Sequence, residues 1–163
     1  MRTEDVQVVG LISDTHGLVR PDVFDALAGV QLILHAGDVG EQVLEELSVI
    51  APVEAVYGNT DPTDDPRLQQ FIEREIGGLH VHVSHGHEVG TPTPQKLLTR
   101  YAADVIVYGH THRQELVEAE GRWVINPGAA GARRFNLLPS LARLTIARRR
   151  VSVEFVELKA GKE

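Results

Sequence analysis

Sulfur-bearing residues are almost absent from the chain. Its 163 residues include a single methionine and no cysteine, which excludes disulfide bonds, thiolate zinc sites and cysteine nucleophiles. Aromatic residues are scarce, at 5%, whereas 42% of the residues are hydrophobic. The chain therefore has the length and the apolar content to bury one domain-sized core, made mainly of Val, Leu, Ile and Ala.

Long apolar runs and an excess of basic residues are missing as well. No apolar run approaches the ~20 residues of a membrane helix, and the acidic residues 1–5 lack the features of a signal peptide. We therefore expect a cytoplasmic protein with no membrane association. The net charge of −7 argues against long nucleic acid as a partner. It leaves room for a small phosphate-bearing substrate, whose charge bound metal ions could offset.

The first sixty residues alternate between apolar runs and segments of helical periodicity. Strands are predicted at 6–12, 31–35 and 53–57, and helices at 21–28 and 41–50. This alternation predicts parallel strands joined by right-handed crossovers. In such sheets, ligands bind beyond the carboxyl ends of the strands.

The second half of the chain is rich in predicted strands. Runs at 71–76 and 79–84 flank Gly77-Gly78 and predict a hairpin. A helix is predicted at 93–102, with Thr93 as its N-cap and Pro94 at its first position. Further strands are expected at 104–108, 115–119, 123–126, 141–147 and 151–158. With no repeat or linker in the sequence, we expect one domain over 1–158 and a loose tail at 159–163.

Five loops that follow predicted strands carry carboxylate, amide and imidazole side chains. They are Asp14-Thr15-His16, Gly37-Asp38, Gly58-Asn59, His85-Gly86-His87 and Gly109-His110-Thr111-His112. Alone, most of them also fit ordinary turns with solvated side chains; the last is the strongest single motif. Together, in loops expected at one sheet edge, they predict a site for two divalent ions. Oxygen and imidazole ligands without sulfur suit Mn, Fe, Zn or Ni better than Ca.

Four histidines lie in or just after the predicted hairpin. His80 and His82 share one face of a strand, and we expect both to lie on a solvated or partner-facing surface. His85, where the strand should end, is the better ligand candidate, and His87 is the second. Asp38 has two carboxylate oxygens, so it could bind one metal ion with each.

Taken in order, these motifs resemble those of the calcineurin-like metallophosphoesterase superfamily, and most of all its small bacterial and archaeal phosphodiesterases. The resemblance runs from Leu11 to Gly128. It implies an α/β fold, namely a two-sheet αββα sandwich, with a dinuclear metal centre. Many members carry a histidine after the Gly-Asn pair that can assist the leaving group; this chain has Thr60 there.

The resemblance also implies the ligands of each ion. One ion would be held by Asp14, His16, Asp38 and His112. The other would be held by Asp38, Asn59, His85 and His110, so that Asp38 bridges the two. Asp38, Asn59 and His85 are the implied catalytic residues, and His35 and Asp61 match positions that support the site.

The expected activity is metal-dependent hydrolysis of small phosphodiesters. Two ions ~3.5–4 Å apart can share a hydroxide, which we expect to attack phosphorus. Manganese is the expected metal, with iron, zinc and nickel as alternatives. Phosphomonoesterase or pyrophosphatase activity in the same site, and a non-catalytic scaffold for protein binding, are the competing readings. The hairpin at 71–84 or the last strands could also form a homodimer.

Overall fold

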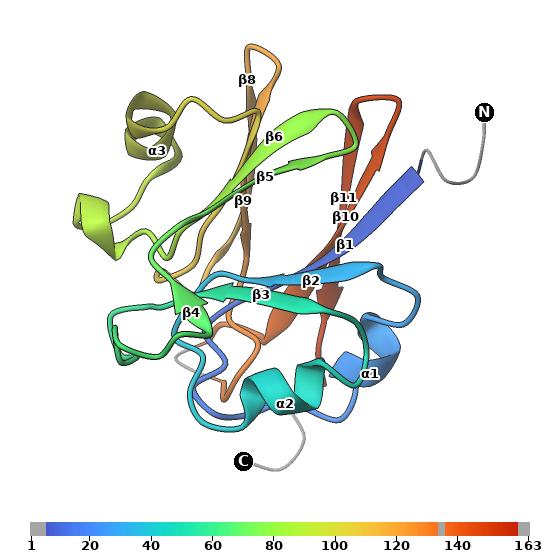
Figure 1. The fold of residues 1–163 in the computed structure, drawn as a ribbon, viewed down its shortest axis with the longest axis vertical. Coiled ribbons are helices and arrows are strands. Elements are labelled where there is room, and N and C mark those ends of the chain that lie inside the picture. Colours follow the sequence, from blue (N-terminus) through green and yellow to red (C-terminus); the bar gives the residue numbers. More distant parts are fainter. Residues whose placement is uncertain (1–5, 134–135, 160–163) are drawn as a thin grey trace.

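A computed structural model describes residues 6–133 and 136–159 (Figure 1). The first of its two sheets has the strand order β11-β10-β1-β2-β3-β4. Its strands are β1 (Val6–Ile12), β2 (Leu32–His35), β3 (Val53–Val56), β4 (Leu68–Gln69), β10 (Ser140–Ala147) and β11 (Arg150–Glu157). Strands β1 to β3 are parallel, as the alternating pattern predicted, and β4 pairs with β3 in the same sense. Strand β10 pairs with β1 in the antiparallel sense.

The second sheet has the order β5-β6-β7-β9-β8. Its strands are β5 (Ile72–Ile76), β6 (Leu79–Val83), β7 (Val105–Val107), β8 (Gln114–Ala119) and β9 (Arg122–Pro127). β5 and β6 form the predicted antiparallel hairpin. Gly77 and Gly78 turn it with φ angles of 58° and 83°, which favour glycine in such turns.

Three apolar cores hold the layers together. The largest lies between the sheets and contains Leu11, Val81 and Leu144. A second joins the first sheet to helices α1 (Val23–Ala26) and α2 (Val43–Leu47). The third joins the second sheet to helix α3 (Pro94–Arg100). Helices therefore cover the outer face of each sheet, and the expected αββα sandwich is confirmed.

Several element boundaries differ from the prediction. Helices α1 and α2 are shorter than expected, because the residues around them form turns. Gln42, just before α2, has a φ of 68°, which a helix does not allow. Strand β4 and the 3₁₀ helix η2 (His87–Val89) were not predicted. Helix α3 has the predicted cap, since Thr93 accepts a hydrogen bond from the Lys96 amide at 3.2 Å.

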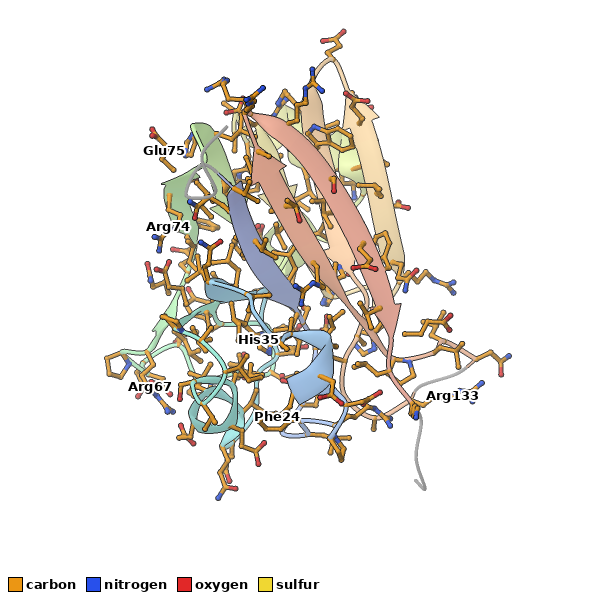
Figure 2. All side chains as sticks on the ribbon, turned by 90° about the vertical axis from the view of Figure 1, so that its right-hand side faces the viewer. Phe24, His35, Arg67, Arg74, Glu75 and Arg133 are labelled. Atoms are coloured by element: carbon orange, nitrogen blue, oxygen red, sulfur yellow. The ribbon has the colours of Figure 1, made fainter. Side chains whose placement is uncertain are left out.

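Most of the predicted C-terminal tail lies outside the described part of the chain. Residues 1–5 and 160–163 lie outside the described part, so the loose tail stays a prediction. Lys159 itself is held: its amide donates to Asp22 and its carbonyl accepts from Arg20. Figure 2 shows the side chains across the fold, with His35 in the interior and Arg67 and Arg74 at the surface. No helix among the described residues is long and apolar enough to cross a membrane.

Candidate metal centre

The five polar loops meet at one edge of the sandwich, where β1, β2, β3, β6 and β7 end. Backbone hydrogen bonds join four of the loops in two pairs. The Asp14 amide donates to the Gly37 carbonyl at 2.9 Å, and the Gly109 amide donates to the His85 carbonyl at 3.0 Å. The backbone alone therefore holds the loops after β1 and β2 together, and likewise the loops after β6 and β7.

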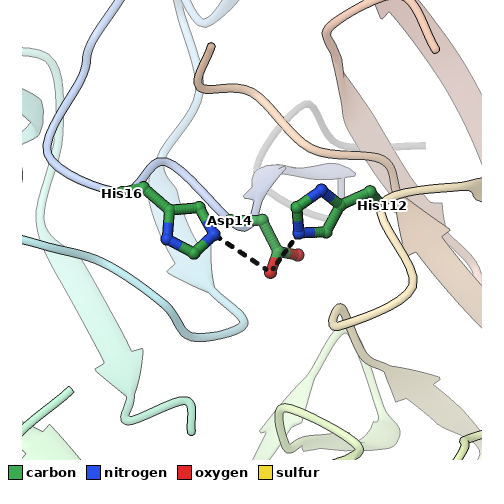
Figure 3. A group of neighbouring side chains, drawn as sticks. All are labelled: Asp14, His16 and His112. Atoms are coloured by element: carbon green, nitrogen blue, oxygen red, sulfur yellow. Dashed lines mark ion pairs between the residues drawn. The ribbon is translucent and has the colours of Figure 1, made fainter. Parts of the chain in front are cut away.

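The first group of side chains consists of Asp14, His16 and His112 (Figure 3). The Asp14 Oδ1 atom lies 3.4 Å from His112 Nε2 and 4.0 Å from His16 Nε2. Asp14 is buried, whereas both imidazoles are partly exposed. The group thus places one carboxylate oxygen and two imidazole nitrogens within 4.8 Å of one another, close enough to bind a single ion.

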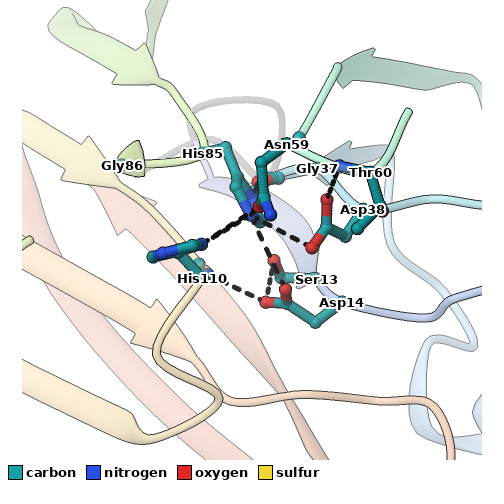
Figure 4. A network of polar contacts seen from close by, with 12 residues as sticks. Ser13, Asp14, Gly37, Asp38, Asn59, Thr60, His85, Gly86 and His110 are labelled. Atoms are coloured by element: carbon teal, nitrogen blue, oxygen red, sulfur yellow. Dashed lines mark hydrogen bonds and ion pairs between the residues drawn. The ribbon is translucent and has the colours of Figure 1, made fainter. Parts of the chain in front are cut away.

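The second group lies beside the first and involves the other candidates (Figure 4). Asp38 Oδ2 is 3.3 Å from His85 Nε2 and 3.6 Å from His16 Nε2. Asn59 Oδ1 is 3.0 Å from His85 Nε2 and 3.1 Å from His110 Nδ1. All seven residues that the sequence singled out as ligands are therefore brought together.

The two oxygens of Asp38 have different surroundings. Oδ1 accepts a hydrogen bond from the Thr60 amide at 3.0 Å, whereas Oδ2 faces both groups of imidazoles. Oδ2 is therefore the Asp38 oxygen that lies near imidazole nitrogens of both groups, while Oδ1 is held by a backbone amide. Burial raises the pKa of the Asp38 carboxyl, but the His85 imidazole and Thr60 lower it more, so that it stays well below its usual range.

Asp14 Oδ1 is buried and accepts no hydrogen bond within the described part of the chain. A buried carboxylate oxygen without a hydrogen bond is costly. Burial raises the pKa of Asp14, but His112 and His85 lower it more, and the net pKa is below its ordinary value. An anionic oxygen ringed by imidazole nitrogens is suited to a cation.

His85 is fixed in one tautomer. Its Nδ1 atom lies 2.7 Å from the Ala36 carbonyl oxygen, and a carbonyl can only accept, so Nδ1 carries the proton. Nε2 is therefore the atom that faces Asn59 and Asp38. Orienting contacts of this kind are usual for histidines that bind metal ions.

Five of the seven candidates have a left-handed backbone. The φ angles are 54° at Asp14, 47° at His16, 54° at Asp38, 74° at His110 and 66° at His112. Such a conformation costs about 1–3 kcal/mol per non-glycine residue and persists where the surrounding structure enforces it, often at functional sites. No sequence pattern had indicated this feature.

His35 and Asp61 support the loops, as the resemblance implied. Asp61 accepts from the amides of Val39 and Gly58 at 3.0 and 2.9 Å. The Thr15 hydroxyl donates to the Val39 carbonyl, so it must accept from His35 Nε2, 2.9 Å away. The Gly37 amide donates to His35 Nδ1. His35 is thus held neutral, and burial lowers its pKa to about 4.

This arrangement predicts acid sensitivity of the fold. Because the folded-state pKa of His35 is about 4 against 6.5 ordinarily, the unfolded chain binds this proton first. The free energy of unfolding should fall by up to about 3 kcal/mol as the pH drops from 6.5 to 4. Urea unfolding of metal-free protein at several pH values measures this.

The matched variant is His35→Asn, which keeps an acceptor for the Gly37 amide but does not titrate. It should be less stable at pH 7 and should lose this part of the pH dependence. If both proteins lose stability equally between pH 6.5 and 4, His35 is not the group responsible.

The remaining histidines in and just after the hairpin lie outside the two ligand groups. His80 is exposed, as predicted, but the expectation for His82 was wrong. His82 is fully buried, because the ring of Tyr101 stacks on it with centroids 3.7 Å apart. His87 lies beside the centre in η2, with its ring centroid 5.4 Å from that of His85.

Glu88 supports the site through contacts that the sequence did not indicate. Glu88 accepts from the Gly86 amide at 3.0 Å and from the Tyr101 hydroxyl at 2.8 Å, which ties α3 to the loop after His85. Burial and Glu88 raise the pKa of Tyr101 to about 12, so the hydroxyl keeps its proton. The pairing depends on the packing of α3, which no local signal reveals.

Comparisons with known proteins agree with this fold. The sequence profile of the calcineurin-like phosphoesterase superfamily domain matches residues 8–149. A probable metallophosphoesterase of Methanothermobacter thermautotrophicus is 38% identical over 152 residues, covering 85% of this chain and 80% of that protein. A phosphodiesterase of Methanocaldococcus jannaschii is 30% identical over 139 residues, covering 74% and 82%.

Solved structures share the architecture. Vacuolar protein sorting 29 from Cryptosporidium parvum superposes with a TM-score of 0.84 at 24% identity, covering 96% of this chain and 94% of that one. The profile match extends over all five polar loops, so the class is that of the metallophosphoesterases. Within it, the chain belongs to the calcineurin-like phosphoesterase superfamily.

Proposed function

We propose that this protein hydrolyses small phosphodiesters at a centre of two divalent ions. The observation that carries the proposal is the position of Asp38 Oδ2, which faces imidazole nitrogens of both groups at 3.3 and 3.6 Å. One ion would be held by Asp14, His16, Asp38 and His112, and the other by Asp38, Asn59, His85 and His110. Support from a relative comes from the phosphodiesterase of Methanocaldococcus jannaschii.

The donor set fits such ions. The unsatisfied oxygen of Asp14 is available to a cation, and neutral imidazoles with carboxylate oxygens suit manganese, iron, zinc or nickel. When bound, two such ions would lower the pKa of water to roughly 7 and offset charge on the phosphoryl oxygens. We propose manganese as the metal to test first.

The residues of the chain would then bind and orient the reactants. His85, with its proton fixed on Nδ1 by Ala36, would present Nε2 as a ligand. The Thr60 amide would hold Oδ1 of Asp38 and so aim Oδ2 at the centre. Thr60 carries no group that titrates near neutral pH, so hydrolysis should be fastest on esters whose leaving group needs no proton.

A direct assay tests this proposal. Protein loaded with Mn²⁺ should release p-nitrophenol from bis-p-nitrophenyl phosphate faster than from p-nitrophenyl phosphate. Removing the metal with EDTA should abolish release, and adding Mn²⁺ back should restore it. A preference for the monoester would favour phosphomonoesterase activity in the same site.

The competing reading is a non-catalytic scaffold for protein binding, and the chain has a structural likeness to vacuolar protein sorting 29. At 24% identity this likeness concerns the fold alone. The seven candidate ligands are all chemically competent and converge in space, which favours the enzyme. Failure to release product from either ester, in protein shown to hold metal, would reverse that preference.

A further inference from the structure

A cleft of about 470 Å³ opens directly beside the candidate metal centre. His112, Arg113 and Gln114, at the start of β8, line it together with Asn136, Leu138 and Glu157. The cleft therefore lies across the mouth of the sandwich, from the edge strand of one sheet to the edge strand of the other. We call it the His112 cleft.

The His112 cleft is continuous with the centre through one side chain. His112 lines the cleft, and its Nε2 atom lies 3.4 Å from Asp14 Oδ1 in the first ligand group. A phosphoryl group held by the two ions would thus carry any substituent on this side into the cleft. A groove on α3 is larger, at about 600 Å³, but none of the seven candidate ligands lines it.

The walls of the cleft combine three kinds of surface. Leu138 is 49% exposed, although burial of a leucine side chain is favourable by about 1.5–3 kcal/mol. The Arg113 guanidinium has no hydrogen-bond or ion-pair partner within residues 6–133 and 136–159, and Arg stacks readily on planar rings. The exposed carboxylate of Glu157 and the amide of Asn136 can accept or donate hydrogen bonds.

These surfaces suit a nucleoside better than a plain alkyl group or a second phosphate. A planar base can pack against Leu138 and Arg113, and a carboxylate is a familiar partner for ribose hydroxyls. The volume is within the 300–1,000 Å³ usual for small-molecule sites. Among the described residues that line the cleft, Glu157 offsets the charge of Arg113, which leaves no surplus of positive charge there to attract a second phosphate.

We propose that the His112 cleft binds a nucleoside substituent of the substrate, which makes the substrate class nucleotide phosphodiesters. This inference rests on the proposed function, since it places the phosphate on the two ions. Leu138 and Arg113 would act as binding residues for the base, while Asp38 and the other ligands hold the phosphate.

Binding of two product-like probes tests the assignment without relying on turnover. AMP and ribose 5-phosphate share a phosphate and a sugar and differ in the base. In calorimetry on Mn²⁺-loaded protein, the Kd of AMP should be about tenfold lower than the Kd of ribose 5-phosphate. Leu138→Ala and Arg113→Ala should each remove most of this preference and leave the Kd for ribose 5-phosphate within about twofold.

Arg150→Ala is the matched control. Arg150 is an exposed arginine at the opposite end of β11 from Glu157, and its loss should leave the preference for AMP unchanged. Arg113 also lines a smaller cleft of about 230 Å³ beside Thr111 and Tyr108. Leu138 does not line it, so Leu138→Ala decides between the two clefts.

The outcomes separate this inference from the proposed function. Equal binding of AMP and ribose 5-phosphate, or no binding of either, would overturn the inference, even in protein that hydrolyses bis-p-nitrophenyl phosphate. A preference for AMP that survives Leu138→Ala would also overturn it, by placing the base elsewhere. A preference lost in Leu138→Ala would support the binding of a nucleoside in the His112 cleft, while the phosphodiesterase assay tests the proposed function separately.

Discussion

Asp38→Asn should lower kcat/KM on bis-p-nitrophenyl phosphate by at least about a thousandfold. Asp38 Oδ2 is the atom that faces both groups of candidate ligands, so the change weakens the hold on both ions at once. Metal ions contribute several kcal/mol of transition-state stabilisation, and each ~1.4 kcal/mol is tenfold in rate. Metal content, measured after dialysis, should fall below two ions per chain.

Asp64→Asn is the matched control for this prediction. It removes the same charge from an exposed position a few residues beyond the Gly58-Asn59 loop, and it should leave metal content and rate unchanged. Near-native metal content and rate in Asp38→Asn would show that Asp38 does not bridge two ions. Equal losses in both variants would point to a general effect of charge instead.

Gly58→Ala should lower the rate by about a hundredfold, although the substitution adds only one methyl group. The new Cβ atom would lie 2.1 Å from Asp38 Oδ1 and 2.4 Å from the Asp38 amide nitrogen. No side chain tolerates such distances, so the Asp38 loop must move. Overpacking of this kind also destabilises a fold by about 1–3 kcal/mol. Kinetics with metal analysis and urea unfolding measure the two effects.

Gly121→Ala provides the contrast. Gly121 has a φ of 79° and nothing within 4 Å of the position of a Cβ atom. The variant should lose about 1–2 kcal/mol of stability through backbone strain and keep its full rate and metal content. If Gly58→Ala kept native rate and metal content, the close contact with Asp38 would not matter for the site.

Much of the centre could be predicted because each candidate ligand follows a buried strand. Runs such as Val6–Ile12 are readable from sequence, and the carboxyl ends of parallel strands meet at one edge. Asp14, Asp38 and His110 are therefore brought together by the order of strands and loops. The apolar pattern of each run fixes the strand, and the crossover rule fixes its direction.

Other features of the site depend on contacts between distant segments. The ring of Tyr101, just after α3, stacks on His82 and helps to bury it. Arg143, on β10, donates to the carbonyls of Ala26, the last residue of α1, and of Ala28. Neither contact has a local signature, because the partners are far apart in the sequence.

The sequence by itself determined which chemical groups gather at the edge of the sheets, because strand periodicity and glycine-bearing turns are local properties. Only the tertiary structure decided which oxygen of Asp38 faces the centre, which backbones are left-handed, and that a cleft adjoins His112. These depend on how loops from different parts of the chain constrain one another. Such constraints arise from packing, and no single segment carries them.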